Sequence, residues 1–330
     1  MNIGFDKLKE LLHGVVYTEE RDGKLILHRF TKEQEEAYKP YNADYYKKTF
    51  GSAGITLEFI TDSTTFALSA HISSASSRKF FSFDVYENGN LIKTAEGILP
   101  DEQTDFDFSA TLGAGKKVVT IYFPWSVVTQ IYSVSVDDSA ELTPIKKSYK
   151  IISFGDSITH GYDAKNPSFS YASRLADALR ADIVNKGIGG EVFFPPLAKL
   201  KDDIEPDYIT VAYGTNDWSR CKDKQGKDNF DTNCKEFYEA LSANYPNSKI
   251  FAITPIWRGD FERDTQVVPF SYINEYISKV TAELPNVTVI NGFELVPHDK
   301  SCYIADLLHP NCEGFRHYAY NLYAEIKKYL

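Results

Sequence analysis

The stretch YKIISFGDSITHG, residues 149–161, decides the fold of the C-terminal part of the chain. YKIISF is a short apolar run, which is typical of a buried strand. The Gly-Asp-Ser that follows is a tight turn in which Gly155 lets the backbone bend sharply. The turn either caps a helix or exposes the hydroxyl of Ser157 at the end of the strand. A strand that leads into a helix in this way is the first unit of a parallel α/β sheet.

The same alternation continues to the end of the chain. Further strands are expected at ADIVN (181–185), DYITVAY (207–213), KIFAIT (249–254) and NVTVIN (286–291). Helical periodicity marks YASRLADALRA (171–181), FYEALSANY (237–245), INEYISKVTAEL (273–284) and GFRHYAYNLYAEIKKYL (314–330). Five short apolar strands separated by helices predict a flavodoxin-like, doubly wound parallel sheet over residues 146–330. Its active site should lie at the carboxyl ends of the strands.

Residues 1–145 are rich in β-strand patterns instead. Two hairpins are expected, at VVYTEERDGKLILHRF (15–30) and at FFSFDVYENGNLIKTAEG (80–97), and three more strands at ITLEFI (55–60), TFALSAHI (65–72) and KKVVTIYFPW (116–125). Asp-Gly and Asn-Gly are the usual turns of short hairpins. Several short strands with few helical stretches predict an all-β sandwich of the jelly-roll kind as a separate N-terminal domain.

Composition narrows the class of protein. The chain has 46 acidic and 36 basic residues, a net charge of −10, and no basic cluster, so it is not expected to bind nucleic acid. The N-terminal MNIGFDKLKELLHG is no signal peptide, and no run approaches the roughly 18 apolar residues of a membrane span. We therefore expect a cytoplasmic protein without a membrane partner.

Four cysteines are present, without a C-x-x-C pair, and no zinc site or other metal site is expected. In a reducing compartment Cys221, Cys234, Cys302 and Cys312 should be free thiols. The alternative is a disulfide between Cys302 and Cys312, which would close the loop between them.

Four polar stretches follow predicted strands or precede the last helix: GDSIT (155–159), NKGIGGE (185–191), YGTNDW (213–218) and ADLLHPN (305–311). Each alone is compatible with an ordinary turn or surface loop. Together they bring a serine hydroxyl, glycine amides that can approach a ligand closely, the Asn216 amide, and an Asp306–His309 pair three residues apart. This order of groups is a much stronger signal than any one of them.

The four stretches resemble the four sequence blocks of the SGNH (GDSL-type) hydrolases, over residues 150–330. The resemblance implies a serine esterase with Ser157 as the nucleophile. His309 would be the general base and later the general acid, and Asp306 would hold the imidazole tautomer. A hydroxyl needs such a base because it is otherwise a poor nucleophile. The resemblance implies no metal and no organic cofactor.

The same resemblance implies an oxyanion hole, the set of donors that stabilises the negative charge of the tetrahedral intermediate. Its donors would be the Ser157 N–H, the Gly190 N–H and the Asn216 side-chain amide. Gly190 is preferred over Gly187 and Gly189 because it aligns best with the family's block.

The layout of a β-rich domain before the hydrolase domain resembles the two-domain carbohydrate esterase family 2. This second resemblance rests on the layout and on phrases such as LEFITDS (57–63) and VTIYFPW (119–125). It implies removal of O-acetyl groups from xylan- or mannan-type oligosaccharides.

Two tryptophans and an arginine lie near predicted strand ends in the hydrolase domain. Trp218, Trp257 and Arg258 are candidates for sugar contacts, with packing under a loop as the alternative. The polar segment 219–235 is expected to be a solvated surface, with a lid or a specificity loop as the alternatives.

Two other functions stay open. The first is an SGNH esterase, lipase or thioesterase for another short-acyl ester, although the polar loops argue against long acyl chains. The second is a glycan-binding protein without activity, against which the complete set of catalytic groups argues. The sequence indicates neither the glycan, nor the acetyl position, nor an oligomeric state.

Overall fold

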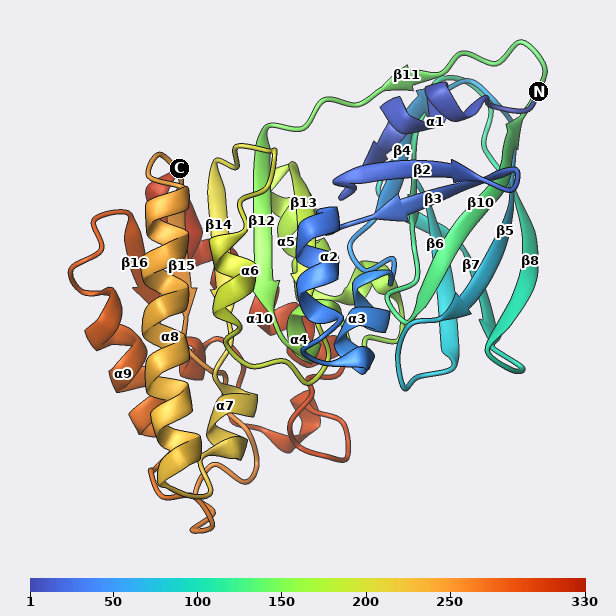
Figure 1. The fold of residues 1–330 in the computed structure, drawn as a ribbon. Coiled ribbons are helices and arrows are strands. Elements are labelled where there is room, and N and C mark those ends of the chain that lie inside the picture. Colours follow the sequence, from blue (N-terminus) through green and yellow to red (C-terminus); the bar gives the residue numbers. More distant parts are fainter.

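The computed structural model describes all 330 residues, and its N-terminal domain is a sandwich of two antiparallel sheets (Figure 1). In spatial order the first sheet contains β1 (Leu12–His13), β4 (Thr56–Thr61), β9 (Lys117–Tyr122), β6 (Phe80–Glu87) and β7 (Asn90–Ile98), with β11 (Thr143–Pro144) beside β4. The second contains β2 (Tyr17–Arg21), β3 (Lys24–His28), β10 (Val127–Val136), β5 (Thr65–Ser74) and β8 (Gln103–Thr111). Both expected hairpins are present, as β2–β3 and β6–β7.

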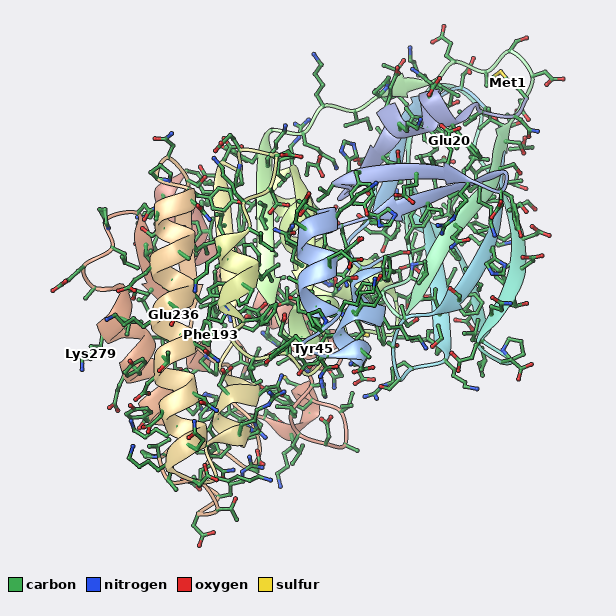
Figure 2. All side chains as sticks on the ribbon, viewed as in Figure 1. Met1, Glu20, Tyr45, Phe193, Glu236 and Lys279 are labelled. Atoms are coloured by element: carbon green, nitrogen blue, oxygen red, sulfur yellow. The ribbon has the colours of Figure 1, made fainter.

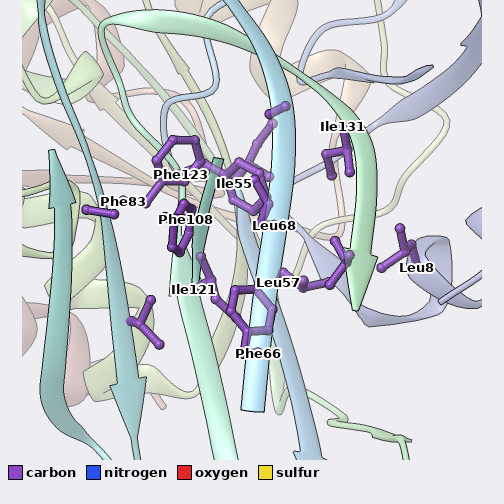
Figure 3. Packing of buried hydrophobic residues seen from close by; sticks show 14 of the residues in the cluster. Leu8, Ile55, Leu57, Phe66, Leu68, Phe83, Phe108, Ile121, Phe123 and Ile131 are labelled. Atoms are coloured by element: carbon purple, nitrogen blue, oxygen red, sulfur yellow. The ribbon is translucent and has the colours of Figure 1, made fainter. Parts of the chain in front are cut away.

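Alternating apolar side chains of the two sheets form the core of the sandwich. Figure 3 shows Phe66, Leu68 and Phe108 of one sheet facing Leu57 and Ile121 of the other. All five are buried, as the period-two pattern of their strands requires. Helix α1 (Phe5–Leu11) closes one end of this core with Leu8.

The C-terminal domain is built on a five-stranded parallel sheet. Its spatial order is β13 (Ala181–Gly187), β12 (Tyr149–Gly155), β14 (Tyr208–Ala212), β15 (Lys249–Ile253) and β16 (Val287–Ile290). This is the 2-1-3-4-5 order of flavodoxin-like folds, and it confirms the predicted fold. The adjacent loops after β12, β13 and β14 therefore meet at one edge of the sheet.

Helices cover both faces of the parallel sheet. One face carries α5 (Tyr171–Leu179) and α10 (Cys312–Ile326), and the other carries α6 (Pro195–Lys199), α8 (Lys224–Asn244) and α9 (Ser271–Thr281). The short helices α4 (Ser157–His160) and α7 (Thr215–Arg220) follow β12 and β14 at the carboxyl edge (Figure 1). Four 3₁₀ turns complete the fold: η1 (Pro167–Phe169), η2 (Gly292–Glu294), η3 (Lys300–Cys302) and η4 (Lys327–Tyr329).

Two helices of the N-terminal domain, α2 (Lys32–Tyr38) and α3 (Ala43–Thr49), lie between the sandwich and the parallel sheet (Figure 1). Tyr38 and Tyr45 belong to the same apolar cluster as the α6–α8 face of the hydrolase domain. These helices were not predicted from the sequence. The domain interface is therefore part of a hydrophobic core.

Several other expectations concern local structure. The segment 219–235 is no loop or lid, because α8 begins at Lys224, capped by Asp223, and runs through it. Residues 222–225 are exposed, as expected of a solvated surface. All four cysteines are free, so no disulfide closes the loop between Cys302 and Cys312. None of the helices combines the length and the apolar character that a membrane span requires. The boundary between residues 145 and 146 stays a prediction; β11 ends at Pro144 and β12 begins at Tyr149.

Candidate active site

Ser157 lies at the carboxyl end of β12, as the first residue of α4. Asp156 caps this helix, because its side chain accepts a hydrogen bond from the Ile158 N–H across 2.9 Å. A side chain at Gly155 would collide with Thr159 Oγ1, which explains why the turn requires glycine. The N–H of Ser157 is among the first amides of the helix, which have no partner inside it.

The structure brings Ser157, His309 and Asp306 together in a hydrogen-bonded chain. Ser157 Oγ lies 2.8 Å from His309 Nε2, and His309 Nδ1 lies 2.6 Å from Asp306 Oδ2. With the proton on Nδ1, Nε2 is free to accept the serine proton. This is the geometry that a nucleophile, a general base and an orienting acid require.

The histidine loop, residues 303–310, is held mainly by its own backbone. Asp306 Oδ1 accepts hydrogen bonds from the N–H groups of Leu308 and His309, across 2.9 and 3.0 Å. The Ile304 N–H donates to the His309 carbonyl, and Tyr303 and Pro310 form an isolated bridge. Partial burial of Asp306 opposes its ionisation, but the hydrogen bonds from His309 and Leu308 outweigh burial and lower its pKa. The carboxylate is therefore ionised and able to hold the imidazole.

The glycine loop, residues 187–191, follows β13 and is tied to the end of β12, where the Ile188 N–H donates to the Gly155 carbonyl across 3.0 Å. Gly190 has a φ of +86°, a conformation that residues with a Cβ rarely adopt. Its N–H has no acceptor within the protein, whereas its carbonyl accepts from Tyr45 and Arg220. An amide without an internal partner is available to a ligand.

Asn216 is the second residue of α7, after β14. Its Nδ2 donates to the Glu191 carbonyl across 2.9 Å, which ties α7 to the glycine loop. An amide nitrogen carries two protons, so one remains for a ligand. The site residues selected from the sequence thus gather at one edge of the sheet. Their roles as nucleophile, base and oxyanion donors stay a proposal.

Three buried carboxyl groups lie directly beneath this edge. Burial raises the pKa of Asp156 to about 6, that of Asp217 to about 7 and that of Glu191 to about 8. The Glu191 carboxyl accepts hydrogen bonds from the hydroxyls of Tyr38 and Tyr213, across 2.5 and 2.7 Å. A cluster of buried groups with perturbed pKa values is a common feature of functional sites.

Three residues around His309 were not found from the sequence: Asp163, Arg78 and Tyr162. Asp163 Oδ2 lies 3.8 Å from His309 Nδ1, and Arg78 of the N-terminal domain makes a bidentate ion pair with Asp163, at 2.9 and 2.8 Å. Tyr162 stacks on the His309 ring at a centroid distance of 6.2 Å. Asp163 lies six residues after the nucleophile in the loop that follows α4, but no sequence signal pointed to Arg78.

The candidate sugar contacts are packed inside the domain. Trp218 is fully buried, its Nε1 donates to the Val268 carbonyl, and the guanidinium of Arg263 lies over its ring. Arg258 is also buried and donates to Thr215 and to Asp260. A stacking platform must expose a ring face, so the structure contradicts the proposed contacts and supports the packing alternative.

Trp257, His160 and Trp125 are also packed inside the protein. Trp257 is buried against Tyr303 and His298, which favours the packing alternative over a sugar contact. His160 is buried as well, and burial holds its pKa well below the usual range. Trp125 packs between the domains, where its Nε1 donates to the Ala164 carbonyl.

Comparisons with known proteins agree with this architecture. Solved structures that share the two-domain fold include three enzymes. A salicylyl-acyltransferase from a tetracycline biosynthetic pathway has a TM-score of 0.80 at 22% identity, over 96% of this chain and 94% of that one. A family two carbohydrate esterase from Clostridium thermocellum in complex with cellohexaose has a TM-score of 0.65 at 20% identity, over 84% and 93%. An acetyl xylan esterase from the rumen bacterium Butyrivibrio proteoclasticus has a TM-score of 0.66 at 15% identity, over 99% and 97%.

At these identities the likeness concerns the fold. No curated protein sequence matches the chain. The model of the GDSL-like lipase/acylhydrolase family, however, matches residues 153–317, half of the chain, and includes every residue of the predicted triad and oxyanion hole. The protein therefore belongs to the GDSL-like lipase/acylhydrolase family and is a carboxylic ester hydrolase with an N-terminal antiparallel β-domain.

Proposed function

We propose that the protein is a serine esterase that removes O-acetyl groups from xylan- or mannan-type oligosaccharides through an acetyl-enzyme on Ser157. The observation that carries the proposal is the hydrogen-bonded chain from Ser157 through His309 to Asp306, beside the free N–H of Gly190. The acetylated sugar as substrate is supported by the shared fold with an acetyl xylan esterase and a carbohydrate esterase.

In this mechanism Ser157 Oγ attacks the acetyl carbonyl while His309 Nε2 takes the hydroxyl proton. The imidazolium is stabilised by Asp306, and the developing oxyanion is met by the N–H groups of Ser157 and Gly190 and by the Asn216 amide. His309 then returns the proton to the departing sugar oxygen. A water molecule, activated by the same histidine, attacks the acetyl-enzyme and releases acetate.

The surroundings of Ser157 are polar. Asp306 has a side-chain exposure of 39% and Arg78 one of 38%; Asp163 pairs with Arg78, and Arg220 binds the Gly190 carbonyl. Charged and hydrogen-bonding groups at the rim suit a hydroxyl-rich substrate better than a long acyl chain.

A second candidate is transfer or hydrolysis of another short acyl group from a thioester or aryl ester. It is favoured by the high TM-score to the salicylyl-acyltransferase. The two functions share the acyl-enzyme and differ in the acyl donor and in the group that accepts the acyl.

The test is acetate release from acetylated xylo- and manno-oligosaccharides, with product masses, in the wild type and in Ser157→Ala. Serine-dependent release supports the acetylesterase. Turnover of aryl esters or thioesters alone would replace the substrate and keep the mechanism. Sugar binding without any turnover would indicate an inactive glycan-binding protein, and turnover that persists in Ser157→Ala would refute the nucleophile.

A further inference from the structure

Side chains of the other domain bind carbonyl groups of the glycine loop and of Asn185 just before it. Arg29 Nη1 donates to the carbonyls of Asn185 and Gly187, across 2.5 and 2.9 Å. Lys48 Nζ donates to the Gly189 carbonyl across 2.8 Å, and Tyr45 Oη donates to the Gly190 carbonyl across 2.5 Å. These contacts join residues more than 140 positions apart in the chain.

Tyr45 and Lys48 both belong to α3, where a spacing of three places them on the same face of the helix. Figure 2 labels Tyr45 at the junction of this helix with the hydrolase domain. Lys48 is buried, with a side-chain exposure of 9%, and its ammonium also pairs with Asp44 across 2.5 Å. The side chain is thus fixed and does not sample many rotamers, as an exposed lysine would.

Peptide geometry connects the Lys48 ammonium to the reaction. The chain has no cis peptide bond, so the Gly189 carbonyl and the Gly190 N–H belong to one planar unit and point in opposite directions. A donor that fixes this carbonyl also fixes the direction of the N–H. The Tyr45 hydroxyl fixes the next peptide unit through the Gly190 carbonyl. Gly190 is thus held on both sides in its unusual conformation.

We propose that Lys48 is a positioning residue for the oxyanion hole. Its ammonium orients the Gly189–Gly190 peptide and increases the positive partial charge on the Gly190 N–H, and Tyr45 supports the same conformation. This inference rests on the proposed function, in which the Gly190 N–H meets the oxyanion. The negative charge develops in the transition state, so the effect falls on kcat and not on KM.

The experiment compares Lys48→Met with Lys47→Met, its neighbour on the same helix. Lys47 is a matched control because its side chain is 46% exposed and pairs with Glu102 instead. Acetate release or, if the substrate differs, aryl-ester turnover is measured per serine titrated with a fluorophosphonate. We expect kcat of Lys48→Met to fall about 10- to 100-fold, less than the full loss of an oxyanion donor, with KM unchanged within about twofold.

Two further variants separate positioning from simple structural support. Lys48→Arg keeps a charged donor and is expected to recover kcat to within about fivefold of the wild type. Tyr45→Phe keeps the ring, removes only the hydroxyl, and is expected to lower kcat about 3- to 10-fold. This variant tests the positioning of Gly190 independently if Lys48→Met fails to fold.

The outcomes distinguish this proposal from the proposed function. Equal kcat in Lys48→Met and Lys47→Met would overturn it, as would a loss confined to KM or to the fraction of titratable serine. If the kcat of Lys48→Arg were as low as that of Lys48→Met, the proposed role of the charge would be overturned. The proposed function itself is tested by a different variant, since it would be refuted by full turnover in Ser157→Ala.

Discussion

The histidine loop and the glycine loop supply opposite halves of the site, and they are held in opposite ways. The histidine loop is tied by hydrogen bonds among its own residues, and its Asp306 side chain is 39% exposed. The glycine loop is buried except at Gly190. Arg29, Lys48 and Tyr45 of the N-terminal domain bind its carbonyls, in addition to Arg220 and Asn216 of its own domain.

The difference matches what each loop has to do. A general base must receive and return a proton next to solvent and substrate, and a local turn can position it well enough. Oxyanion donors act only if they are already fixed before the charge develops, because reorganisation at that moment lowers the benefit. A loop with three glycines cannot supply this rigidity alone, so it takes it from another domain.

The largest effect is expected at the histidine loop. His309→Ala removes the base and should lower kcat by about 10⁴-fold or more, since a serine hydroxyl is then not activated. The loop is held by its backbone, by Asp306 and by the Gly259 N–H, which donates to the Leu307 carbonyl. None of these bonds needs the imidazole, so urea unfolding should be nearly unchanged. A loss of folding stability that accounts for the lost activity would contradict the view of a self-contained loop.

Asn216→Ala tests the rigid half of the site. The variant loses both an oxyanion donor and the tie to the Glu191 carbonyl, and kcat should fall about 10²- to 10³-fold. The loss should exceed any rise in KM, as steady-state kinetics will measure. If KM alone rises, Asn216 contacts the substrate in its ground state and is not an oxyanion donor.

Glu191 tests the burial of the glycine loop through pH. Its folded-state pKa is raised to about 8 by burial, so the folded protein keeps a proton that the unfolded chain releases near its ordinary value of 4.5. The free energy of unfolding should therefore decrease as pH rises from about 4.5 to 8, by at most about 1.4 kcal/mol per pH unit for this one proton. Glu191→Gln should remove this share of the slope in urea unfolding between pH 5 and 8. An unchanged slope would show that Glu191 is ionised in the folded protein.

Arg78→Met tests whether the N-terminal domain also affects the histidine loop, because Arg78 of that domain pairs with Asp163 beside His309. Without its partner, Asp163 would keep an unpaired charge 3.8 Å from His309 Nδ1 and could compete with Asp306 for the imidazole proton. The pair is partly exposed, so we expect only about a threefold to tenfold loss in kcat. The double variant with Asp163→Asn should recover most of it. Additive losses would mean that the pair does not act through His309.

Sequence patterns predicted those parts of the molecule that depend on local order. Each of the five parallel strands was marked by a short apolar run. Ser157, Asn216 and the Asp306–His309 pair each followed a strand or preceded the last helix, and parallel topology then brought them to one edge. The order of elements was sufficient because strand ends of a parallel sheet meet by construction.

Contacts between the domains could not be predicted in this way. Nothing in the neighbourhood of Lys48 or Arg78 signals a partner that lies 85 or more residues away. The sugar contact predicted for Trp218 was wrong for a related reason. A tryptophan after a strand end has the same local sequence pattern whether its ring is exposed or, as here, covered by Arg263. Side-chain burial depends on tertiary packing, which periodicity alone does not describe.

Arg29 has a consequence for how such a protein can evolve. Its buried guanidinium binds carbonyls of Gly51 and Lys48 in one domain and of Asn185 and Gly187 in the other, and burial lowers its pKa to about 9. A buried charge or carbonyl left without its partner is costly. Recombination that joined this hydrolase domain to an unrelated sandwich would leave such groups unpaired beside the glycine loop. Exchange of the sandwich would therefore require matching changes at Arg29 and at the glycine loop.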